Sequence, residues 1–338
     1  MHTQPTTRRS VTRTDVARHA EVSAAVVSYV VNDGPRNVAP ETRARVLESI
    51  RVLGYRPNAA ARSLKIGVTE IIGLVMPDTT NPFYAAYARD VEKAAASRGL
   101  SVIVVNSALD RDHEDDLVRK LLSRQVDGLL LAPIDNDPDL AETVTTNTPV
   151  VLLNRAGGSE GVASVGVDFY EASRTATGHL IGHGHRVIGL IGNDSGEWIT
   201  VERERGWRDA LTAMKIADGP VQRVESSRDG GYRAGQRLLA LANRPTAIYV
   251  MSDIQAMGLM RALHEANVRV PEDMAVISFD GSIEAEFSWP PLTSMRQPVA
   301  EMTRAAVDAL SRTWPDGPKH REFTAELVVR ESCGCTVD

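Results

Sequence analysis

Residues 14–32 read TDVARHAEVSAAVVSYVVN, which divides into two short helical patterns with a turn between them. Thr12 and Asp15 have the spacing of a capping box, so a first helix is predicted over about 13–20. After the turn at 21–22, Ser23 can cap a second helix. The helical period turns Val26, Val27, Val30 and Val31 inward and Ala24, Ala25, Ser28, Tyr29 and Asn32 outward. Small and polar side chains near the start of such a helix are typical of a helix that enters the DNA major groove.

A third helix and the charge of the head complete this region. Pro40 at a first helical position predicts a helix that Gly54 ends, with Val46, Leu47, Ile50 and Leu53 on its inward face. Residues 1–66 carry 11 Lys and Arg against 5 acidic residues, a formal charge of +6, whereas the remaining 272 residues carry −12. A basic head on an acidic body favours contact between the head and a polyanion, although charge alone would also fit a solvated helical face.

From residue 70 onward, apolar runs rich in β-forming residues alternate with helical stretches such as 83–98 and 113–124. The runs lie at 71–76, 102–105, 128–131, 150–153, 187–191, 247–250 and 275–279. Runs of this kind mark strands that are buried on both faces, as in parallel sheets covered by helices. Four runs before about residue 165 and three between about 168 and 290 predict two α/β lobes.

Several further motifs follow in order along the chain. They are PETRARVLESIRVLGYRPNAAARSLK (40–65), IIGLVMPDTTNPFY (71–84), VDGLLL (126–131), GHGHRVIGLI (182–191), SFD (278–280), PPLTSMRQP (290–298) and ELVVRESCG (326–334). Together with residues 14–32, they resemble the lactose/galactose repressor (LacI/GalR) family of bacterial transcription factors over roughly residues 11–334. The resemblance implies an α/β protein: an N-terminal three-helix helix-turn-helix DNA-binding head plus a periplasmic-binding-protein-like core of two doubly wound α/β lobes.

The resemblance also implies how the chain divides. The head would comprise residues 1–57 and a hinge helix or linker residues 58–69. The N-subdomain of the core would comprise 70–166 and 297–321, because a helix at about 300–311 returns to the first lobe. The C-subdomain would comprise 167–296 and 322–338, because a final strand at about 324–330 returns to the second lobe. An effector cleft is expected between the two lobes.

In the head, the resemblance assigns two sets of DNA-contacting residues. Ala24, Ala25 and Tyr29 match positions that read base edges, and Ser23, Ser28, Asn32 and Thr42 match positions that contact phosphates. Alanine can pack against a thymine methyl group but offers no hydrogen bond, and Tyr29 stands where many relatives have an arginine. The base preference of a relative therefore cannot be transferred to this chain. The alternative for Tyr29 is a surface ring that packs on its neighbours.

The linker at 58–66 reads NAAARSLKI, which is prone to form a helix but lacks an apolar face broad enough for its own core. The resemblance implies a hinge helix that forms when two subunits bind operator DNA, with Leu64 as a wedge in the minor groove. Asn58, Arg62 and Lys65 complete the predicted DNA-contacting residues. The alternative for Leu64 is packing against the body.

Polar residues directly after predicted strands outline the cleft. They include Asp78 and Arg155, and the resemblance assigns six residues to the effector, among them the apolar Phe83 and Arg203 at the start of a helix: Asn81, Phe83, Asn154, Arg203, Ser252 and Asp280. Carboxylate, amide and guanidinium groups bind hydroxyls, and Phe83, Trp198 or Tyr232 could stack on a sugar face. This mixture predicts a polyol effector, a sugar or sugar derivative. The alternative for Arg203 and Asp280 is a structural ion pair or cap.

The remaining chemical motifs are weak. His179, His183 and His185 lie in HLIGHGH without the glutamate of a zinc protease, and this segment fits a helix end, a glycine and a strand start better. Cys333 and Cys335 are too few and too close for a disulfide framework or a four-ligand zinc site, so we interpret them as reduced thiols. Fingerprints for dinucleotides, phosphate loops and nucleophile elbows are lacking as well. We therefore predict no cofactor, no metal and no enzymatic activity.

These observations favour a homodimeric transcriptional repressor that binds a palindromic operator in double-stranded DNA and responds to a small-molecule effector. A solute receptor for transport would also need two lobes, but the basic head and the lack of a signal-peptide-like segment oppose it. A sugar-acting enzyme would need a catalytic constellation. No apolar run suggests a membrane helix, so we expect a cytoplasmic protein, nucleoid-associated when bound to DNA. A chain that ends soon after RESCG leaves no room for a heptad tail, which favours a dimer.

Overall fold

The computed structural model describes residues 11–32, 37–56, 67–134, 140, 146–155, 162–194, 198–310 and 320–336. The chain separates into two compact units at residues 69 and 70, here called the head and the body. Within the described residues, no helix is both long enough and apolar enough to cross a membrane.

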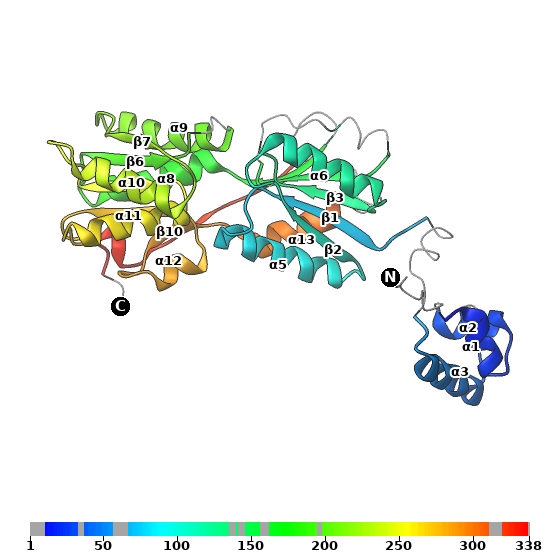
Figure 1. Ribbon diagram of the computed structural model, residues 1–338. Coiled ribbons are helices and arrows are strands. Elements are labelled where there is room, and N and C mark those ends of the chain that lie inside the picture. Colours follow the sequence, from blue (N-terminus) through cyan, green and yellow to red (C-terminus); the bar gives the residue numbers. More distant parts are fainter. Residues whose placement is uncertain are drawn as a thin grey trace, which may run out of the picture. The chain divides into compact units, whose positions relative to one another are not determined.

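The head consists of helices α1 (Arg13–His19), α2 (Ala24–Val31) and α3 (Pro40–Leu53), which pack together in Figure 1. The predicted capping box is present, because Thr12 and Asp15 each accept a hydrogen bond from the other's backbone N–H. The Ser23 hydroxyl caps α2 by accepting from the N–H of Val26. At the end of α3, Gly54 adopts a left-handed φ of 67°. Local sequence signals therefore set all three helices.

The core of the head corrects two sequence predictions. Leu47 is 49% exposed, and Ser49 takes a buried place on α3 instead, with its hydroxyl donating to the carbonyl of Arg45. The inward face of α3 thus runs through positions 46, 49, 50 and 53, and residue 47 lies about 100° away from residue 46. Ala24, predicted to face outward, is half-buried and packs against the apolar cluster of the head.

The first lobe of the body contains a six-stranded sheet in the order β11-β5-β4-β3-β1-β2. Its strands are β1 (Ile71–Met76), β2 (Ser101–Asn106), β3 (Gly128–Leu131), β4 (Val150–Leu153), β5 (Ala163–Val167) and β11 (His320–Phe323), and every described pairing is parallel. Helices α5 (Pro82–Ala96), α6 (Arg111–Ser123) and α13 (Val299–Ala309) belong to this lobe. The doubly wound arrangement expected from the apolar runs is confirmed here.

The second lobe repeats the arrangement with a sheet in the order β12-β10-β9-β8-β6-β7. Its strands are β6 (Ile188–Gly192), β7 (Val221–Arg223), β8 (Ala247–Val250), β9 (Ala275–Asp280), β10 (Thr293–Arg296) and β12 (Glu326–Val328). Only β12 is antiparallel to its neighbour among the described pairs. The helices of this lobe are α8 (Phe169–Gly182), α9 (Trp198–Ala213), α10 (Arg228–Leu239), α11 (Asp253–Glu265), α12 (Ile283–Phe287) and the 3-10 helix η1 (Glu331–Cys333).

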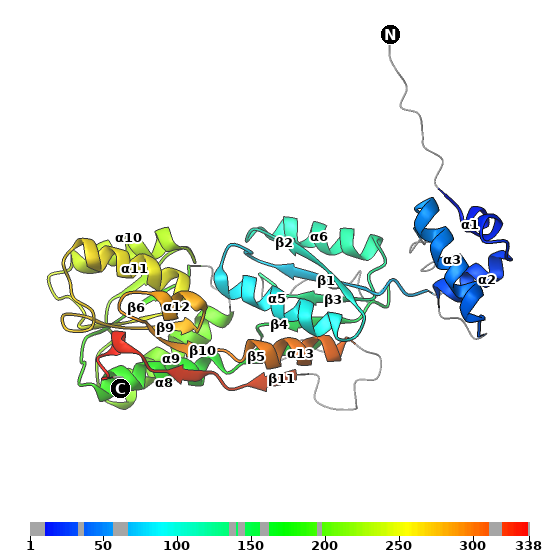
Figure 2. The same ribbon diagram turned by 90° about the horizontal axis from the view of Figure 1, so that it is seen from below.

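Three described connections join the lobes: β5 to α8, β10 to α13, and β11 to β12. Figures 1 and 2 show these connections running between the two sheets. The final strand predicted at 324–330 in the second lobe is confirmed as β12, and β11 in the first sheet is an additional strand that the sequence did not predict. β11 ends at Phe323, two residues beyond the predicted boundary at 321. The pairing of β11 with β5 extends to this residue, which explains the difference.

Candidate functional site

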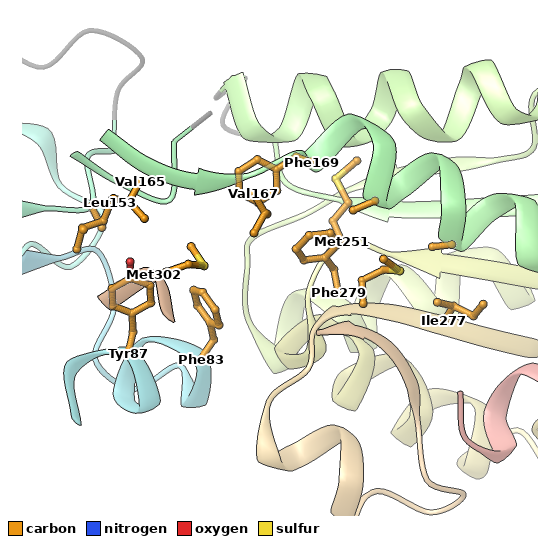
Figure 3. Close-up of a cluster of buried hydrophobic side chains, with 14 of the residues drawn as sticks. Phe83, Tyr87, Leu153, Val165, Val167, Phe169, Met251, Ile277, Phe279 and Met302 are labelled. Carbon is orange, nitrogen blue, oxygen red and sulfur yellow. The ribbon is translucent and has the colours of Figure 1, made fainter. Parts of the chain in front are cut away.

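One pocket of the body lies between the two lobes, at the carboxyl ends of β1, β4, β6, β8 and β9. All six residues predicted to contact an effector line it: Asn81, Phe83, Asn154, Arg203, Ser252 and Asp280. Parallel strands direct their carboxyl ends to the same edge, so short loops from distant parts of the chain meet there. Figure 3 shows buried apolar side chains of the two lobes, with Phe83 and Tyr87 of α5 on one side and Met251 and Phe279 of the second lobe on the other.

The first lobe presents buried neutral polar and aromatic groups to the pocket, together with the half-buried Asp78 and Arg155. The side-chain oxygen Oδ1 of Asn81 caps α5 by accepting from the N–H of Phe83 at 3.0 Å. The Phe83 ring packs edge-on against Tyr84 and Tyr87, with centroids 5.2 and 5.9 Å apart. Asn154 has a left-handed φ of 58°, and its buried Oδ1 has no hydrogen-bond partner among the described residues. An oxygen in that situation is ready to accept a hydrogen bond from a ligand.

The second lobe contributes a rigid cation. The guanidinium carbon of Arg203 lies 4.0 Å from the ring centroid of Phe279 and 4.8 Å from that of Phe169, so the two rings hold it by cation–π contact. Its Nη1 donates to the carbonyl of Met251 at 2.7 Å. Its Nε is buried without a hydrogen-bond partner in the described part of the chain. The side chain is therefore fixed in place while it retains a donor for a ligand.

Asp280 lies opposite this cation at the end of β9. Its Oδ1 is 3.8 Å from Nη2 of Arg203, too far for a hydrogen bond. The side-chain amide of Gln297 donates to the same oxygen at 3.2 Å. Burial raises the pKa of Asp280 to about 8, against the opposing effect of Arg203. The positive φ of 114° at a non-glycine residue indicates local strain, which is often found at binding sites.

Ser252 lies in the pocket, but its hydroxyl already has local partners. It accepts from the N–H of Gln255 at 3.4 Å as the cap of α11 and donates to Oε1 of the same residue at 2.9 Å. The amide of Gln255 in turn donates to the carbonyl of Gly192 at 3.1 Å. Gln255 also lines the pocket, and sequence reasoning missed it because its position inside α11 carries no strand-end signal.

The structure separates the remaining sequence candidates for this site. Asp78, Arg155 and Trp198 line the pocket, whereas Tyr232 is not among the lining residues. The Tyr232 hydroxyl instead donates to Glu265 at 2.6 Å on an exposed surface. The stacking role predicted for Tyr232 is therefore wrong, because the hydroxyl belongs to a contact between α10 and α11.

The predicted DNA-contacting residues of the head lie on or beside α2 and at the start of α3. Ser23, Ala25 and Asn32 are exposed, and Ala24, Ser28, Tyr29 and Thr42 are half-buried. The Asn32 side-chain amide donates to the hydroxyl and the carbonyl of Ser28, which ties the end of α2 together. The predicted hinge residues Asn58, Arg62, Leu64 and Lys65 lie outside the described residues.

Comparisons with known proteins agree with this architecture. Residues 12–58 match the model for bacterial regulatory proteins of the lacI family, and residues 177–333 match a periplasmic binding protein-like domain. The catabolite control protein A of Priestia megaterium is 35% identical over 90% of this chain and 92% of its own length. The transcriptional repressor PurR of Photobacterium profundum is 32% identical over 94% and 97%.

Solved structures give the same result. A lac repressor dimer bound to operator and the anti-inducer ONPF superposes with a TM-score of 0.84 at 26% identity, covering 96% of this chain and 99% of that chain. A complex of the transcriptional regulator CelR with cellobiose gives 0.70 at 31% identity, covering 95% and 99%. The chain belongs to the LacI family of bacterial regulatory proteins. It is a DNA-binding transcriptional regulator with an effector-binding type of core, and its relatives are regulators rather than enzymes.

Proposed function

We propose that the protein is a homodimeric repressor that binds a palindromic operator and is controlled by a sugar or sugar derivative in the pocket between the lobes. The observation that carries the effector part is the pair formed by Arg203 and Asp280, which are buried together and are separated by 3.8 Å. Buried polar or charged groups that lack full hydrogen bonding are costly unless a ligand supplies the missing partners. A bound polyol would complete them.

The chemistry of the pocket favours a polyol over an apolar ligand. Asn154 Oδ1 needs a donor and Arg203 Nε needs an acceptor, and each sugar hydroxyl is both. Phe83 and Trp198 supply aromatic surface for the C–H face of a ring. The cellobiose bound to the CelR relative is consistent with this choice.

The connection between the lobes gives an effector a way to act on the heads. The backbone N–H of Gln297 donates to the carbonyl of Asp280, and its side chain donates to the carboxylate. Gln297 lies in the connection from β10 to α13, so a ligand on Asp280 would bias the angle between the lobes. By linkage, an effector that weakens operator binding is itself bound less tightly by the operator complex.

A group of exposed apolar side chains on α12 and the loop after it supports the homodimer. Ile283, Phe287 and Trp289 are 61%, 78% and 89% exposed in the single chain. We propose that a second copy of the chain covers this apolar group, because reading a palindrome requires two heads related by two-fold symmetry. Sedimentation equilibrium should give a dimer for the wild type and a lower association constant for Trp289→Glu. Met214→Glu, at another exposed apolar position, should leave the association unchanged.

The effector proposal is tested by a thermal-shift screen of sugars and sugar phosphates, followed by calorimetric titration of any hit. At pH 8.5, above the pKa of Asp280, Asp280→Asn should bind the hit at least tenfold more weakly than the wild type, since a hydrogen bond to a charged group contributes about 1.5–3 kcal/mol. Asp273→Asn, which changes an exposed aspartate paired with Arg269, should bind it like the wild type. Equal affinities of all three proteins would overturn the assignment of Asp280 to the effector.

The operator proposal is tested by selection of the full-length protein on random duplex DNA. Enrichment of a palindrome with half-sites about one helical turn apart is expected. Enrichment of a single half-site would contradict the dimeric reading, and no enrichment with or without the sugar hit would contradict repressor function.

A further inference from the structure

A second group of reactive side chains lies in the second lobe, apart from the pocket residues. His179 is in the last turn of α8, and His183 follows one turn later as the residue after its end. Cys333 ends η1, and Cys335 follows two residues later. The ligand atoms of these four side chains all lie within 4.8 Å of one another. Residues separated by about 150 positions in the sequence therefore converge on one point.

Two of the separations between these ligand atoms are of the size expected around a metal ion. Nε2 of His183 is 3.2 Å and Nε2 of His179 is 3.5 Å from the Sγ atom of Cys335. Ligands of a tetrahedral zinc ion, with Zn–S near 2.3 Å and Zn–N near 2.0–2.1 Å, lie roughly 3.3–3.8 Å apart. A small contraction of the wider separations would complete a tetrahedron.

The backbone holds both pairs in place. His179 and His183 are four residues apart at the end of a helix, a spacing that puts both rings on one face, and their centroids are 4.8 Å apart. The neighbouring Ser332 is anchored on the sheet, because its hydroxyl accepts from the N–H of Thr293 at 2.8 Å and donates to the carbonyl of Val276 at 2.7 Å. Gly334 has a φ of 92°, which lets the chain turn so that Cys335 returns towards the histidines.

We propose that His179, His183, Cys333 and Cys335 form a structural zinc site that clamps the segment after β12 to the end of α8. Two imidazoles and two thiolates are the donors of a closed tetrahedral zinc site, and soft sulfur donors disfavour magnesium, calcium and manganese. The H-x3-H spacing is usual for zinc, and the C-x-C spacing is shorter than the usual C-x2-4-C. The proposal does not depend on the identity of the effector.

The experiment uses the full chain without an affinity tag, prepared with reducing agent and dialysed against metal-free buffer. Zinc affinity is measured by competition with a colorimetric chelator, and cobalt serves as a spectroscopic probe of the ligands. His183→Gln and Cys335→Ser change side chains that are not fully buried, so both variants should fold. His185→Gln is the matched control, because its Nδ1 faces the Thr246 hydroxyl at 2.9 Å instead of the cysteines.

The wild type and His185→Gln should bind one zinc ion per chain, and His183→Gln and Cys335→Ser should bind it at least tenfold more weakly. The cobalt form should show thiolate-to-metal charge transfer and the strong visible bands of a tetrahedral site, and Cys335→Ser should weaken the charge transfer. Zinc should raise the melting temperature of the wild type but not of Cys335→Ser. Equal zinc binding by all four proteins would identify an adventitious ion only, and cobalt bands without charge transfer would exclude the thiolates. Either result overturns the proposal.

Discussion

The two walls of the pocket perform different physical tasks. On the first-lobe wall the buried side chains of Asn81, Phe83 and Asn154 are neutral, and the charged Asp78 and Arg155 are only half-buried. The second-lobe wall has Arg203 between two aromatic rings and Asp280 beside it, both buried. Because the energy of a charged group depends strongly on its surroundings, the second wall should govern affinity and pH dependence. The first wall should govern how a ligand ring is oriented and how closely the lobes approach each other.

A buried network extends the polarity of the second wall into its lobe. The Asp253 carboxylate accepts from the hydroxyls of Ser278 and Ser294 and from the N–H of Ser282 at 2.6 Å. Burial raises the pKa of Asp253, and these hydrogen bonds oppose the rise. On the first-lobe side, Asn81 caps α5 and the Phe83 ring packs against the Tyr87 ring. Removal of one polar partner should therefore lower the free energy of unfolding more in the second lobe than in the first.

The largest expected effect comes from Arg203→Ala. This change removes two cation–π contacts and the hydrogen bond to Met251, and it leaves Asp280 buried without its cation. We expect the free energy of unfolding of the body to fall by about 2–4 kcal/mol, together with loss of effector binding. Urea unfolding of the variant is the measurement, with Arg205→Ala at an exposed position of the same helix as control. If Arg203→Ala lowered the free energy of unfolding as little as the control, the second wall would not contribute more to stability than the first.

The raised pKa of Asp280 should make the stability of the body depend on pH. Its pKa is about 8 in the folded protein against 3.8 for the free side chain, so the folded state holds an extra proton between these values. The contribution of Asp280 to the free energy of unfolding should therefore be complete below about pH 4. It should decrease as the pH rises towards 8, by at most about 1.4 kcal/mol per pH unit.

The measurement is urea unfolding of the wild type and of Asp280→Asn at several pH values between 5 and 8.5. The wild type should lose stability relative to the variant as the pH rises, because asparagine binds no proton in this range. A constant difference between the two proteins would mean that Asp280 is ionised throughout, and the pair with Arg203 would then be a plain ion pair.

The two walls also offer a matched pair of helix caps. Asn81 caps α5 from the first lobe, and Ser252 caps α11 from the second. Asn81→Ala and Ser252→Ala should each cost about 1 kcal/mol. Ser252 also donates to the buried Gln255, so its loss should be the larger of the two. Thermal unfolding of both variants compares them directly, and a larger loss for Asn81→Ala would reverse the ranking of the walls.

The sequence predicts the parts of this molecule that depend on neighbouring residues. The capping box at Thr12 and the left-handed turn at Gly54 are local, and so are the polar residues that follow buried strands. β7 and β11 escape such reasoning, because they are three or four residues long and are not apolar runs. The convergence of His179 with Cys335 depends on how the chain returns to the second lobe, which no local pattern records.

Packing context explains the other errors. Leu47 looks like a core residue by type, but the face of α3 that meets α1 and α2 passes through Ser49 instead. Ser252 lies in the pocket, as its position after a strand predicts, yet its hydroxyl is bonded to Gln255 three residues further on. Residue type and position thus indicate where a side chain lies more reliably than which hydrogen bonds it makes.

The smallest effect is expected at Tyr232, an aromatic residue that lies outside the pocket. Tyr232 has an aromatic ring of the kind that binds sugars, but its hydroxyl is bonded to Glu265 outside the pocket. Tyr232→Phe removes one exposed hydrogen bond, so stability should change by less than about 0.5 kcal/mol and the affinity for a sugar hit should not change. Trp198→Ala, which removes a ring from the pocket, should weaken the same affinity severalfold because stacking surface is lost. Calorimetric titration of both variants is the measurement. If Tyr232→Phe weakened binding as much as Trp198→Ala, the effector would lie outside the pocket, and the contrast between its walls would not govern recognition.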